Sequence, residues 1–321
     1  MDERHSLGLA AAMIDLRNIE TFFWAAALGS LRAAGEKLGT TQPAVSQRIA
    51  ALELALGVKL FDRAARGVRL TAKGQELLAH AEQLIQARNG LVETARDSTT
   101  MSGRLNLGVA ETIVQTWLPK LIAEIHMAYP DLTLEIEVDT SEMLQSYLMS
   151  RRIDLAFLMG PVLEPRVANR PLCTYPLAWI AKPGLYSSEK SVSVETICAL
   201  PVITYGSNST PYRQVRDILQ RYRFPAPRMY GSASLSMIAK MALDGIGTAV
   251  ITPVFLGAEI ARGELEILDV DADPLNDLHF TASWIDGPDS HAARVITHMA
   301  QQVARNSVGN VLITDLGGEE I

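Results

Sequence analysis

The sequence has little of what marks several classes of protein. Its 321 residues include only two cysteines, Cys173 and Cys198, which lie far apart and form no CxxC spacing. A disulfide scaffold and a structural zinc site are therefore excluded, and a reducing compartment is favoured. The longest uncharged apolar stretch, residues 245–258, is too short to cross a bilayer and contains Pro253. No membrane-spanning segment is predicted.

The first residues lack the pattern of a secretory signal. Asp2 and Glu3 stand where a signal peptide is positively charged, and the apolar residues that follow reach Asp15 without a cleavage site. We therefore predict a cytoplasmic protein in which residues 1–12 are a disordered or extra N-terminal segment.

Groups for catalysis are scarce as well. The six histidines are scattered, and none has the spacing of a metal site or of a base beside a nucleophile. They are His5, His80, His126, His279, His291 and His298. The sequence therefore predicts no catalytic residue, no metal site and no cofactor.

The charge of the chain is distributed unevenly. The net charge of −7, from 29 basic and 36 acidic residues, argues against a nucleic-acid-binding protein when taken alone. Residues 15–74, however, contain nine basic and five acidic side chains, a local charge of +4, which leaves −11 for the remainder. The sequence thus predicts a basic head, residues 13–71, on an acidic body.

The head has the pattern of consecutive short helices. Apolar residues at helical spacing predict a first helix that ends at Gly29. Ser30 can cap a second helix, which stops at Gly39, and Thr41 can cap a third, which begins at Gln42. Two helices joined by a tight turn that contains glycine are typical of a helix-turn-helix.

The third helix has short polar residues at its start and an apolar stripe along one side. Glutamine can pair with adenine, proline and alanine can touch thymine methyl groups, and serine can bond a base or a phosphate. The candidate DNA contacts in the helices are Ser30, Thr41, Gln42, Pro43, Ala44, Ser46, Gln47 and Arg48.

A short hairpin is predicted after the third helix. Apolar runs at residues 58–61 and 68–70 flank a turn at Gly67. Three arginines gather around this turn, where they can lie along the phosphate backbone or enter the minor groove. Arg63, Arg66 and Arg69 are therefore candidate DNA contacts in a wing.

Residues 22–74 resemble the N-terminal winged helix-turn-helix of LysR-type transcriptional regulators. They follow the pattern of that family closely in the small-residue helix, the TQPAVS start of the third helix, and the later segments LELALG, LFDR and LTAKG. Gly35 departs from the alanine usual there, and Arg32 from a common serine or threonine. Glycine is expected to weaken the second helix by up to about 1 kcal/mol.

Residues 72–102 are predicted to form a long linker helix and a hinge. Leu77, Leu84 and Leu91 repeat every seven residues, and so do Leu78, Ile85 and Val92. This double seam favours pairing with a second copy of the helix, although packing against the protein's own body remains the alternative. The resemblance implies a homodimer through this helix and a homotetramer, a DNA operator with two-fold related half-sites, and RNA polymerase as a further partner.

The body, residues 103–321, alternates between apolar runs and amphipathic helices. This order predicts parallel sheets covered by helices. It resembles the two-lobe effector domain of the same regulators, which is similar to periplasmic solute-binding proteins of type 2. The resemblance implies lobe I from residues 103–173 and 277–321 and lobe II from residues 174–276. The predicted fold class is therefore α/β, with a winged helix-turn-helix (all-α with a β wing), a linker helix and a two-lobe effector domain.

Polar residues follow several of the predicted strands. In open α/β sheets a ligand lies at the carboxyl ends of the strands, close to helix N-termini. Helix capping is the alternative role for each of these residues. The candidate effector contacts are Ala110, Glu111, Thr112, Ile113, Thr204, Tyr205, Ser207, Asn208, Ser232, Ser234 and Thr252.

Glu111 does not suit a simple carboxylate effector. It places a negative charge at the helix N-terminus where such an effector is expected. Either Glu111 stabilises the helix end and points outward, or the effector carries donors, such as an amine or an amino-substituted ring. Both interpretations remain open at this point.

The predicted function is that of a sequence-specific DNA-binding transcription factor, regulated by a small-molecule effector between two lobes. An enzyme or a solute-binding protein with the same two-lobe fold is the alternative. Both alternatives leave the winged head unexplained, and the first lacks catalytic groups.

Overall fold

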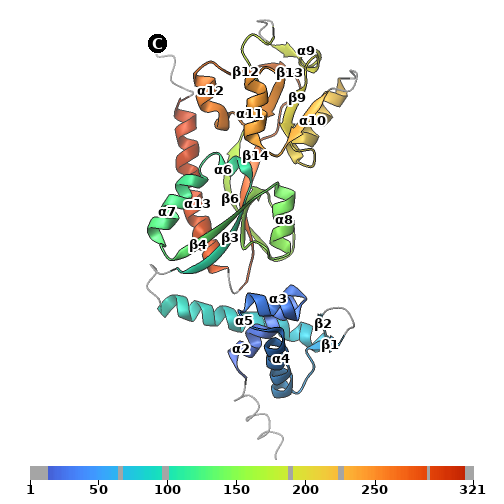
Figure 1. The fold of residues 1–321 in the computed structure, drawn as a ribbon, viewed down its shortest axis with the longest axis vertical. Helices are drawn as coiled ribbons and strands as arrows, with labels where there is room; N and C mark the ends of the chain where they lie inside the picture. Colours follow the sequence, from blue (N-terminus) through green and yellow to red (C-terminus); the bar gives the residue numbers. More distant parts are fainter. Residues whose placement is uncertain are drawn as a thin grey trace, which may run out of the picture. The chain divides into compact units, whose positions relative to one another are not determined.

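The chain forms two compact units in the computed structural model, which describes residues 14–63, 68–95, 101–186, 191–222, 228–287 and 290–314. The first unit contains the head and the long helix that follows it, and the second contains two α/β lobes (Figure 1). None of the helices in these described residues is both long and apolar enough to cross a membrane.

Three helices make the core of the first unit. They are α2 (Leu16–Leu28), α3 (Leu31–Lys37) and α4 (Gln42–Leu56). Ser30 and Thr41 cap α3 and α4, because their hydroxyls accept hydrogen bonds from the backbone amides of Ala33 and Ala44. Phe22 and Phe23 of α2 pack with the apolar face of α4 in one buried cluster.

Close packing explains why a glycine stands at position 35, which the sequence alone does not show. A Cβ at this position would lie 2.9 Å from the backbone oxygen of Thr40, and the Thr40 amide donates to the Gly35 oxygen at 2.8 Å. The turn between α3 and α4 thus approaches α3 more closely than a side chain allows.

The wing is a two-stranded antiparallel sheet of β1 (Phe61–Arg63) and β2 (Val68–Leu70). The prediction that the first strand spans residues 58–61 is wrong. The backbone amides of Leu60 and Phe61 donate to the Glu53 side chain of α4, and the Leu60 oxygen accepts from the Thr71 amide. The Leu60 amide is thus bonded to Glu53 instead of to the opposite strand, and β1 begins at Phe61.

Helix α5 (Ala72–Ala95) divides its apolar residues between two surroundings. Ile85 is 1% exposed and belongs to the buried cluster of the head, against which Leu78 also packs. Leu84 and Leu91 are 49% and 71% exposed. Leu77, which belongs to the same repeat as Leu84 and Leu91, also packs against the head. The predicted seam is therefore divided: Leu77, Leu78 and Ile85 pack in the head, and Leu84 and Leu91 lie on the surface.

Lobe I is built on a five-stranded sheet of order β4-β3-β5-β14-β6. Its strands are β3 (Gly103–Val109), β4 (Leu132–Val138), β5 (Leu155–Met159), β6 (Val167–Tyr175) and β14 (Leu278–Ile285). Its helices are α6 (Glu111–Val114), α7 (Leu118–Ala128), α8 (Ser141–Met149) and α13 (His291–Thr314). Apolar residues of α7, α8 and α13 pack with the strands in one buried cluster.

Lobe II is built on a second five-stranded sheet, of order β10-β9-β11-β7-β12. Its strands are β7 (Ala178–Ala181), β9 (Val202–Tyr205), β10 (Met229–Ser232), β11 (Thr248–Ile251) and β12 (Glu266–Leu268), and β8 (Val192–Ser193) pairs with β13 (Val270–Asp271). Its helices are α9 (Val194–Cys198), α10 (Thr210–Arg221), α11 (Leu235–Leu243), the 3₁₀ helix η1 (Pro253–Leu256) and α12 (Gly257–Ala261). Helix α11 packs in one buried cluster with the sheet, and α9 and α10 pack in another.

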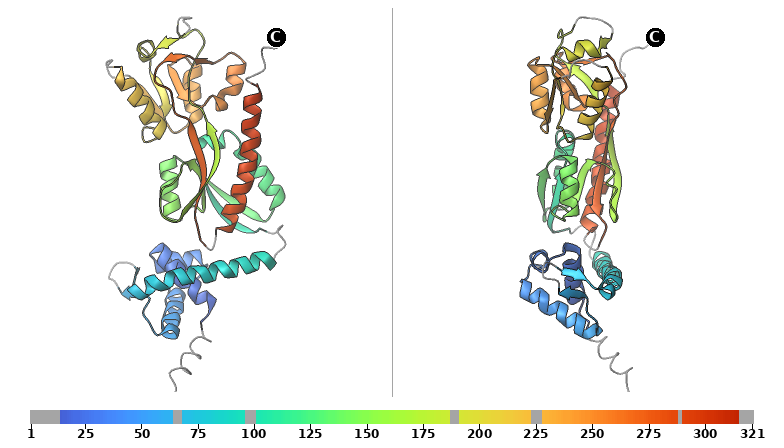
Figure 2. Two further views of the ribbon diagram at one scale, coloured as in Figure 1. Left: turned by 180° about the vertical axis from the view of Figure 1, so that it is seen from behind. Right: turned by 90° about the vertical axis from the view of Figure 1, so that its right-hand side faces the viewer.

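Both large sheets are mixed, so the prediction of parallel sheets is wrong. Strand β14 runs antiparallel to β5 and β6, and β7 runs antiparallel to β11 and β12. Strand β6, which carries the chain from lobe I towards lobe II, was not predicted from the sequence. Strand β14 returns beside it, paired from Leu278 opposite Tyr175 to Ile285 opposite Val167 (Figure 2). Two strands that cross between the same lobes in opposite directions are necessarily antiparallel.

Candidate functional site

The start of helix α4 presents a polar surface. Val45, Ile49 and Leu52 bury the opposite stripe of the helix in the head. Of the predicted DNA contacts, Thr41, Gln42, Pro43, Ser46 and Gln47 are exposed, whereas Ser30, Ala44 and Arg48 are half-buried. Pro43 is compatible with its place because the first turn of a helix has no internal acceptor for its amide. The exposed glutamines, Gln42 and Gln47, thus lie within the first turn and a half of α4, with Ser46 between them.

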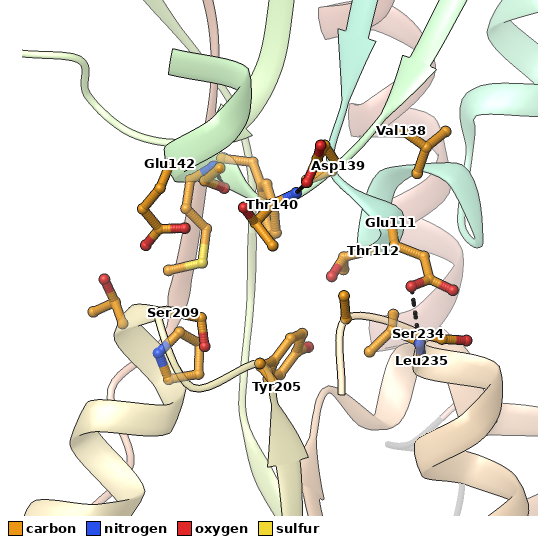
Figure 3. Close-up of a pocket in the computed structure, with 18 of the residues that line it drawn as sticks. Glu111, Thr112, Val138, Asp139, Thr140, Glu142, Tyr205, Ser209, Ser234 and Leu235 are labelled. Carbon is orange, nitrogen blue, oxygen red and sulfur yellow. Dashed lines mark hydrogen bonds between the residues drawn. The ribbon is translucent and has the colours of Figure 1, made fainter. Parts of the chain in front are cut away.

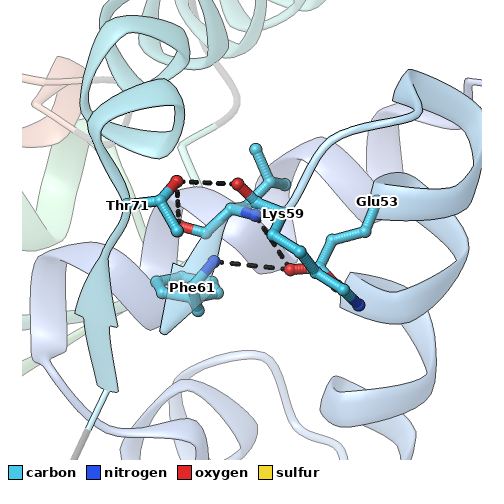
Figure 4. Close-up of polar contacts among 5 residues, drawn as sticks. Glu53, Lys59, Phe61 and Thr71 are labelled. Carbon is cyan, nitrogen blue, oxygen red and sulfur yellow. Dashed lines mark hydrogen bonds and ion pairs between the residues drawn. The ribbon is translucent and has the colours of Figure 1, made fainter. Parts of the chain in front are cut away.

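A carboxylate holds this helix to the wing. Glu53 accepts hydrogen bonds from Lys59 Nζ at 2.6 Å and from the amides of Leu60 and Phe61 at 2.9 and 3.3 Å (Figure 4). Burial alone raises the pKa of Glu53, but these three donors together outweigh it and lower the pKa below its ordinary value. The Thr71 hydroxyl donates to the Lys59 oxygen at 2.7 Å and secures the end of the wing.

The wing is described in part. Arg69 of β2 is exposed and stands opposite Asp62 in the hairpin. Arg66 and the side chain of Arg63 lie outside the described residues. Their assignment as DNA contacts therefore stays a prediction.

A cavity of about 600 Å³ lies between the two lobes of the second unit. Lobe I contributes the ends of β3, β4 and β5 with the first turns of α6 and α8, and lobe II contributes the end of β9 with the first turns of α10 and α11 (Figure 3). The cavity thus lies where strands end and helices begin, which is the usual position of a ligand site in α/β sheets.

The structure brings together part of the predicted effector site. Ala110, Glu111, Thr112, Tyr205 and Ser234 line the cavity. The other predicted residues do not: they are Ile113, Thr204, Ser207, Asn208, Ser232 and Thr252.

The residues outside the cavity have structural roles or lie on the surface. Ile113 is fully buried in the core of lobe I. The buried Thr204 hydroxyl donates to the Val250 oxygen at 2.8 Å, and buried Thr252 caps η1. Ser207 and Asn208 are exposed, and the half-buried Ser232 accepts a hydrogen bond from the Ser234 amide through its hydroxyl.

The loop between β4 and α8 lines the cavity but was not predicted to do so. This loop and the start of α8 contribute Asp139, Thr140, Ser141, Glu142 and Gln145 to the cavity. In lobe II the loop before α10 was expected to face the ligand, and its residues Ser209 and Thr210 line the cavity, whereas Arg213 was not predicted. The signal was available, because the segment DTSE directly follows the predicted strand LTLEIEV.

The Glu111 carboxylate bridges the two lobes. It accepts a hydrogen bond at 2.9 Å from the backbone amide of Leu235, the first residue of α11. Ser234, the N-cap residue of that helix, also accepts from the Met237 amide. Glu111 thus neither points outward nor stands free in the cavity, which differs from both interpretations of the sequence.

A second charged pair lies across the cavity. Arg213 of α10 is 4.0 Å from Glu142 of α8, and both side chains are nearly half exposed. Arg213 also donates to the Asn208 oxygen at 2.6 Å and to the Thr210 hydroxyl at 2.8 Å. The guanidinium therefore holds the turn before α10 while facing the opposite lobe.

Tyr205 packs against both lobes. Its ring contacts the buried cluster of lobe I and that of α11 in lobe II. Its hydroxyl is buried and has no hydrogen-bond partner within the described part of the chain. Burial raises the pKa of Tyr205 to about 12, so the hydroxyl is uncharged at neutral pH.

The two cysteines are free and belong to different lobes. Burial raises the pKa of the Cys173 thiol to about 11, and it also raises the pKa of Cys198. Both are therefore protonated near neutral pH, which agrees with structural thiols. Across the residues that the structure describes, no three His, Cys, Asp or Glu side chains are placed to hold a metal ion.

A winged helix-turn-helix joined to a two-lobe domain with a cavity between its lobes defines a class of protein, the ligand-responsive DNA-binding regulators. Sequence similarity identifies the family. Residues 16–75 match the family described as "Bacterial regulatory helix-turn-helix protein, lysR family", and residues 98–305 match "LysR substrate binding domain". The chain belongs to the LysR family of DNA-binding transcriptional regulators, which are not enzymes. Regulators of this family bind DNA and small-molecule effectors and form oligomers.

Relatives share this organisation over most of their length. The regulator BbuR of Bordetella bronchiseptica is 29% identical over 255 residues, which cover 78% of this chain and 77% of that protein. The activator CmpR of Synechocystis is 28% identical over 262 residues, covering 81% and 86%.

Two solved structures have a similar fold. ArgP from Mycobacterium tuberculosis has a TM-score of 0.61 and 20% identity, with 91% of this chain and 97% of that chain covered. LysG from Corynebacterium glutamicum, with bound effector Arg, has a TM-score of 0.60 and 19% identity, with 91% and 99% covered.

Proposed function

We propose that the effector of this regulator binds in the cavity between the lobes and carries a positively charged or donor-rich group, such as an amine or an amino-substituted ring. The observation that carries this proposal is the charge of the lining. Of the described residues around the cavity, Glu111, Asp139 and Glu142 are acidic, and Arg213 is basic. A cationic group gains from this excess of carboxylates, whereas a small carboxylate is repelled by it.

The helix N-termini at the cavity are partly occupied by the chain's own side chains. Such termini attract anions when their first amides are free. At three of these termini a capping side chain occupies one amide, the third of the helix: Thr140 in α8, Ser209 in α10 and Ser234 in α11. The solved structure of LysG holds the effector Arg, which carries cationic groups beside its carboxylate, so a cationic group is the first class to test.

The effector class is tested by thermal denaturation of the full-length chain. The probes are phenethylamine, 2-aminopyridine and, as the matched carboxylate, phenylacetate. A ligand present at ten times its Kd stabilises the folded state by about 1.4 kcal/mol. We expect the amine probes to raise the Tm of the second unit by about 3–5 °C, and phenylacetate to leave it unchanged. A shift with phenylacetate alone would assign a small carboxylate instead.

We further propose that two chains pair through the exposed face of α5 and that dimers pair into tetramers. The two heads of a dimer would then bind an operator with two-fold related half-sites. Leu84 and Leu91 support this proposal, because they form an exposed apolar row that a second copy of the helix would bury. The regulator would act in the cytoplasm, beside RNA polymerase on the promoter. For its organisation we propose residues 13–71 for DNA binding, 72–102 for dimerisation, and 103–321 for effector binding.

DNA recognition is expected to divide between α4 and the wing. Gln47→Ala should relax specificity at one base position and cost about 1–3 kcal/mol on the cognate site. Arg69→Ala should instead weaken binding to all sequences and reduce the slope of log K against log salt by about 0.9. Titrations of a selected site and of random DNA at several salt concentrations separate the two effects. Equal losses on both DNAs for Gln47→Ala would exclude base reading by Gln47.

A further inference from the structure

The contact between Glu111 and Leu235 joins parts of the chain that are distant in sequence. Glu111 is the first residue of α6 in lobe I, and Leu235 is the first residue of α11 in lobe II. The Leu235 amide donates to Glu111 Oε2 at 2.9 Å across the edge of the cavity (Figure 3). A carboxylate from one lobe therefore already occupies a helix N-terminus of the other.

This position is the one that a free carboxylate in the cavity would seek. The first amides of a helix carry partial positive charge, and α11 spans Leu235–Leu243. Glu111 is tethered beside them, so its effective concentration exceeds that of a small anion in solution. A carboxylate ligand would have to displace Glu111 and then remain close to its negative charge.

We propose that Glu111 determines the charge specificity of the pocket: by occupying the Leu235 amide it excludes carboxylate ligands, and its removal creates a binding site for them. This inference rests on the proposed function of the cavity as the effector pocket. The proposed function attributes the preference for cationic ligands to all the acidic residues of the lining. The inference assigns that preference to the Glu111 side chain.

The other acidic residues at the cavity do not occupy an amide of the opposite lobe. Asp139 accepts from the Thr140 amide at 2.7 Å and from the Tyr147 hydroxyl at 2.9 Å, both within lobe I. Glu142 faces a side chain, Arg213, at 4.0 Å. Removing Glu142 therefore changes the charge of the lining without releasing a backbone donor, which makes Glu142→Ala the matched control.

The test compares the binding of phenylacetate and phenethylamine to four full-length proteins by isothermal titration calorimetry. These are the wild type, Glu111→Ala, Glu111→Gln and Glu142→Ala. We expect Glu111→Ala to gain affinity for phenylacetate at least tenfold over the wild type, because it frees the Leu235 amide. Glu111→Gln should gain less than threefold, because the amide oxygen of glutamine still accepts from Leu235. Glu142→Ala should also gain less than threefold.

Several results would overturn the inference. A folded Glu111→Ala protein without a gain would show that the amide does not bind anions. An equal gain in Glu111→Gln or in Glu142→Ala would show that net charge alone sets the preference. If Glu111→Ala does not fold, Glu111→Ser, whose side chain is too short to reach Leu235, replaces it and carries the same expectation.

The wild type separates this inference from the proposed function. Binding of phenethylamine by the wild type, with no phenylacetate gain in Glu111→Ala, would overturn the inference alone. Failure of the wild type to bind the amine, with a tenfold phenylacetate gain in Glu111→Ala, would contradict the proposed effector class and support the inference. Absence of binding in all four proteins would overturn both.

Discussion

The double variant Leu84→Asp with Leu91→Asp is expected to be a monomer at micromolar concentration and to lose at least a hundredfold in affinity for a two-fold symmetric operator. Burial of one leucine contributes about 1.5–3 kcal/mol, and a symmetric interface buries each of these residues twice. Because both side chains are exposed in the protomer, their replacement leaves the core of the head intact. Light scattering after size-exclusion chromatography measures the mass, and titration of DNA selected from random sequence measures the affinity.

Two control variants define what this result means. Leu54 of α4 is 85% exposed and lies off the seam, so Leu54→Asp should leave the oligomeric state unchanged. Ile85 is buried in the head, so Ile85→Asp should unfold the head rather than only separate the protomers. An unchanged mass for the double variant would place the dimer contact on another surface.

Glu53→Ala is expected to destabilise the head by about 2–3 kcal/mol, because the amides of Leu60 and Phe61 lose a charged acceptor. The Glu53 side chain is only 10% exposed, so water replaces it incompletely. Native-state hydrogen exchange of the α4 amides reports the free energy of unfolding of this unit alone. Glu36→Ala is the control, because its pair with Arg32 is highly exposed and contributes at most about 0.5 kcal/mol. A loss for Glu53→Ala no larger than that of the control would show that the network is dispensable.

The contribution of Glu53 also depends on pH. Its pKa is lowered in the folded protein, so the unfolded chain takes up a proton first as the pH falls. The stabilisation is complete above the ordinary carboxyl pKa and is lost as the pH drops through the lowered value in the folded state. The difference in stability between the wild type and Glu53→Ala should therefore be largest at neutral pH and shrink in acid.

The head was predictable because its signals are local. Gly29 ends α2, and Ser30 and Thr41 cap the starts of α3 and α4. Each of these residues acts within a few positions of its own place in the chain, so the helix boundaries can be read from the sequence. The start of β1 was not predictable in this way. It depends on the Glu53 side chain reaching the amides of Leu60 and Phe61, a contact that no propensity of residues 58–60 reveals.

The position of the cavity was predictable from the sequence, but the set of residues that line it was not. Strand ends locate it, and Thr112, Tyr205 and Ser234 line it. Thr204 and Thr252 also end strands, yet their hydroxyls bond the backbone inside lobe II. The sequence does not distinguish a hydroxyl turned into a lobe from one turned into the cavity. The role of Glu111 was hidden for a related reason, because its partner is a backbone amide that has no signature in sequence.

In a dimer paired through Leu84 and Leu91, the division of α5 between a buried and an exposed side sets the angle of each head about the helix axis. Leu84 and Ile85 are adjacent, so their side chains are about 100° apart around the helix axis. The helix cannot turn to offer another face to a partner without exposing Ile85, which is 1% exposed in the head. In a dimer paired through Leu84 and Leu91, each head is therefore fixed at one angle about the axis of its own helix. The half-sites that a dimer can reach are thus restricted by the core of each protomer before any effector binds.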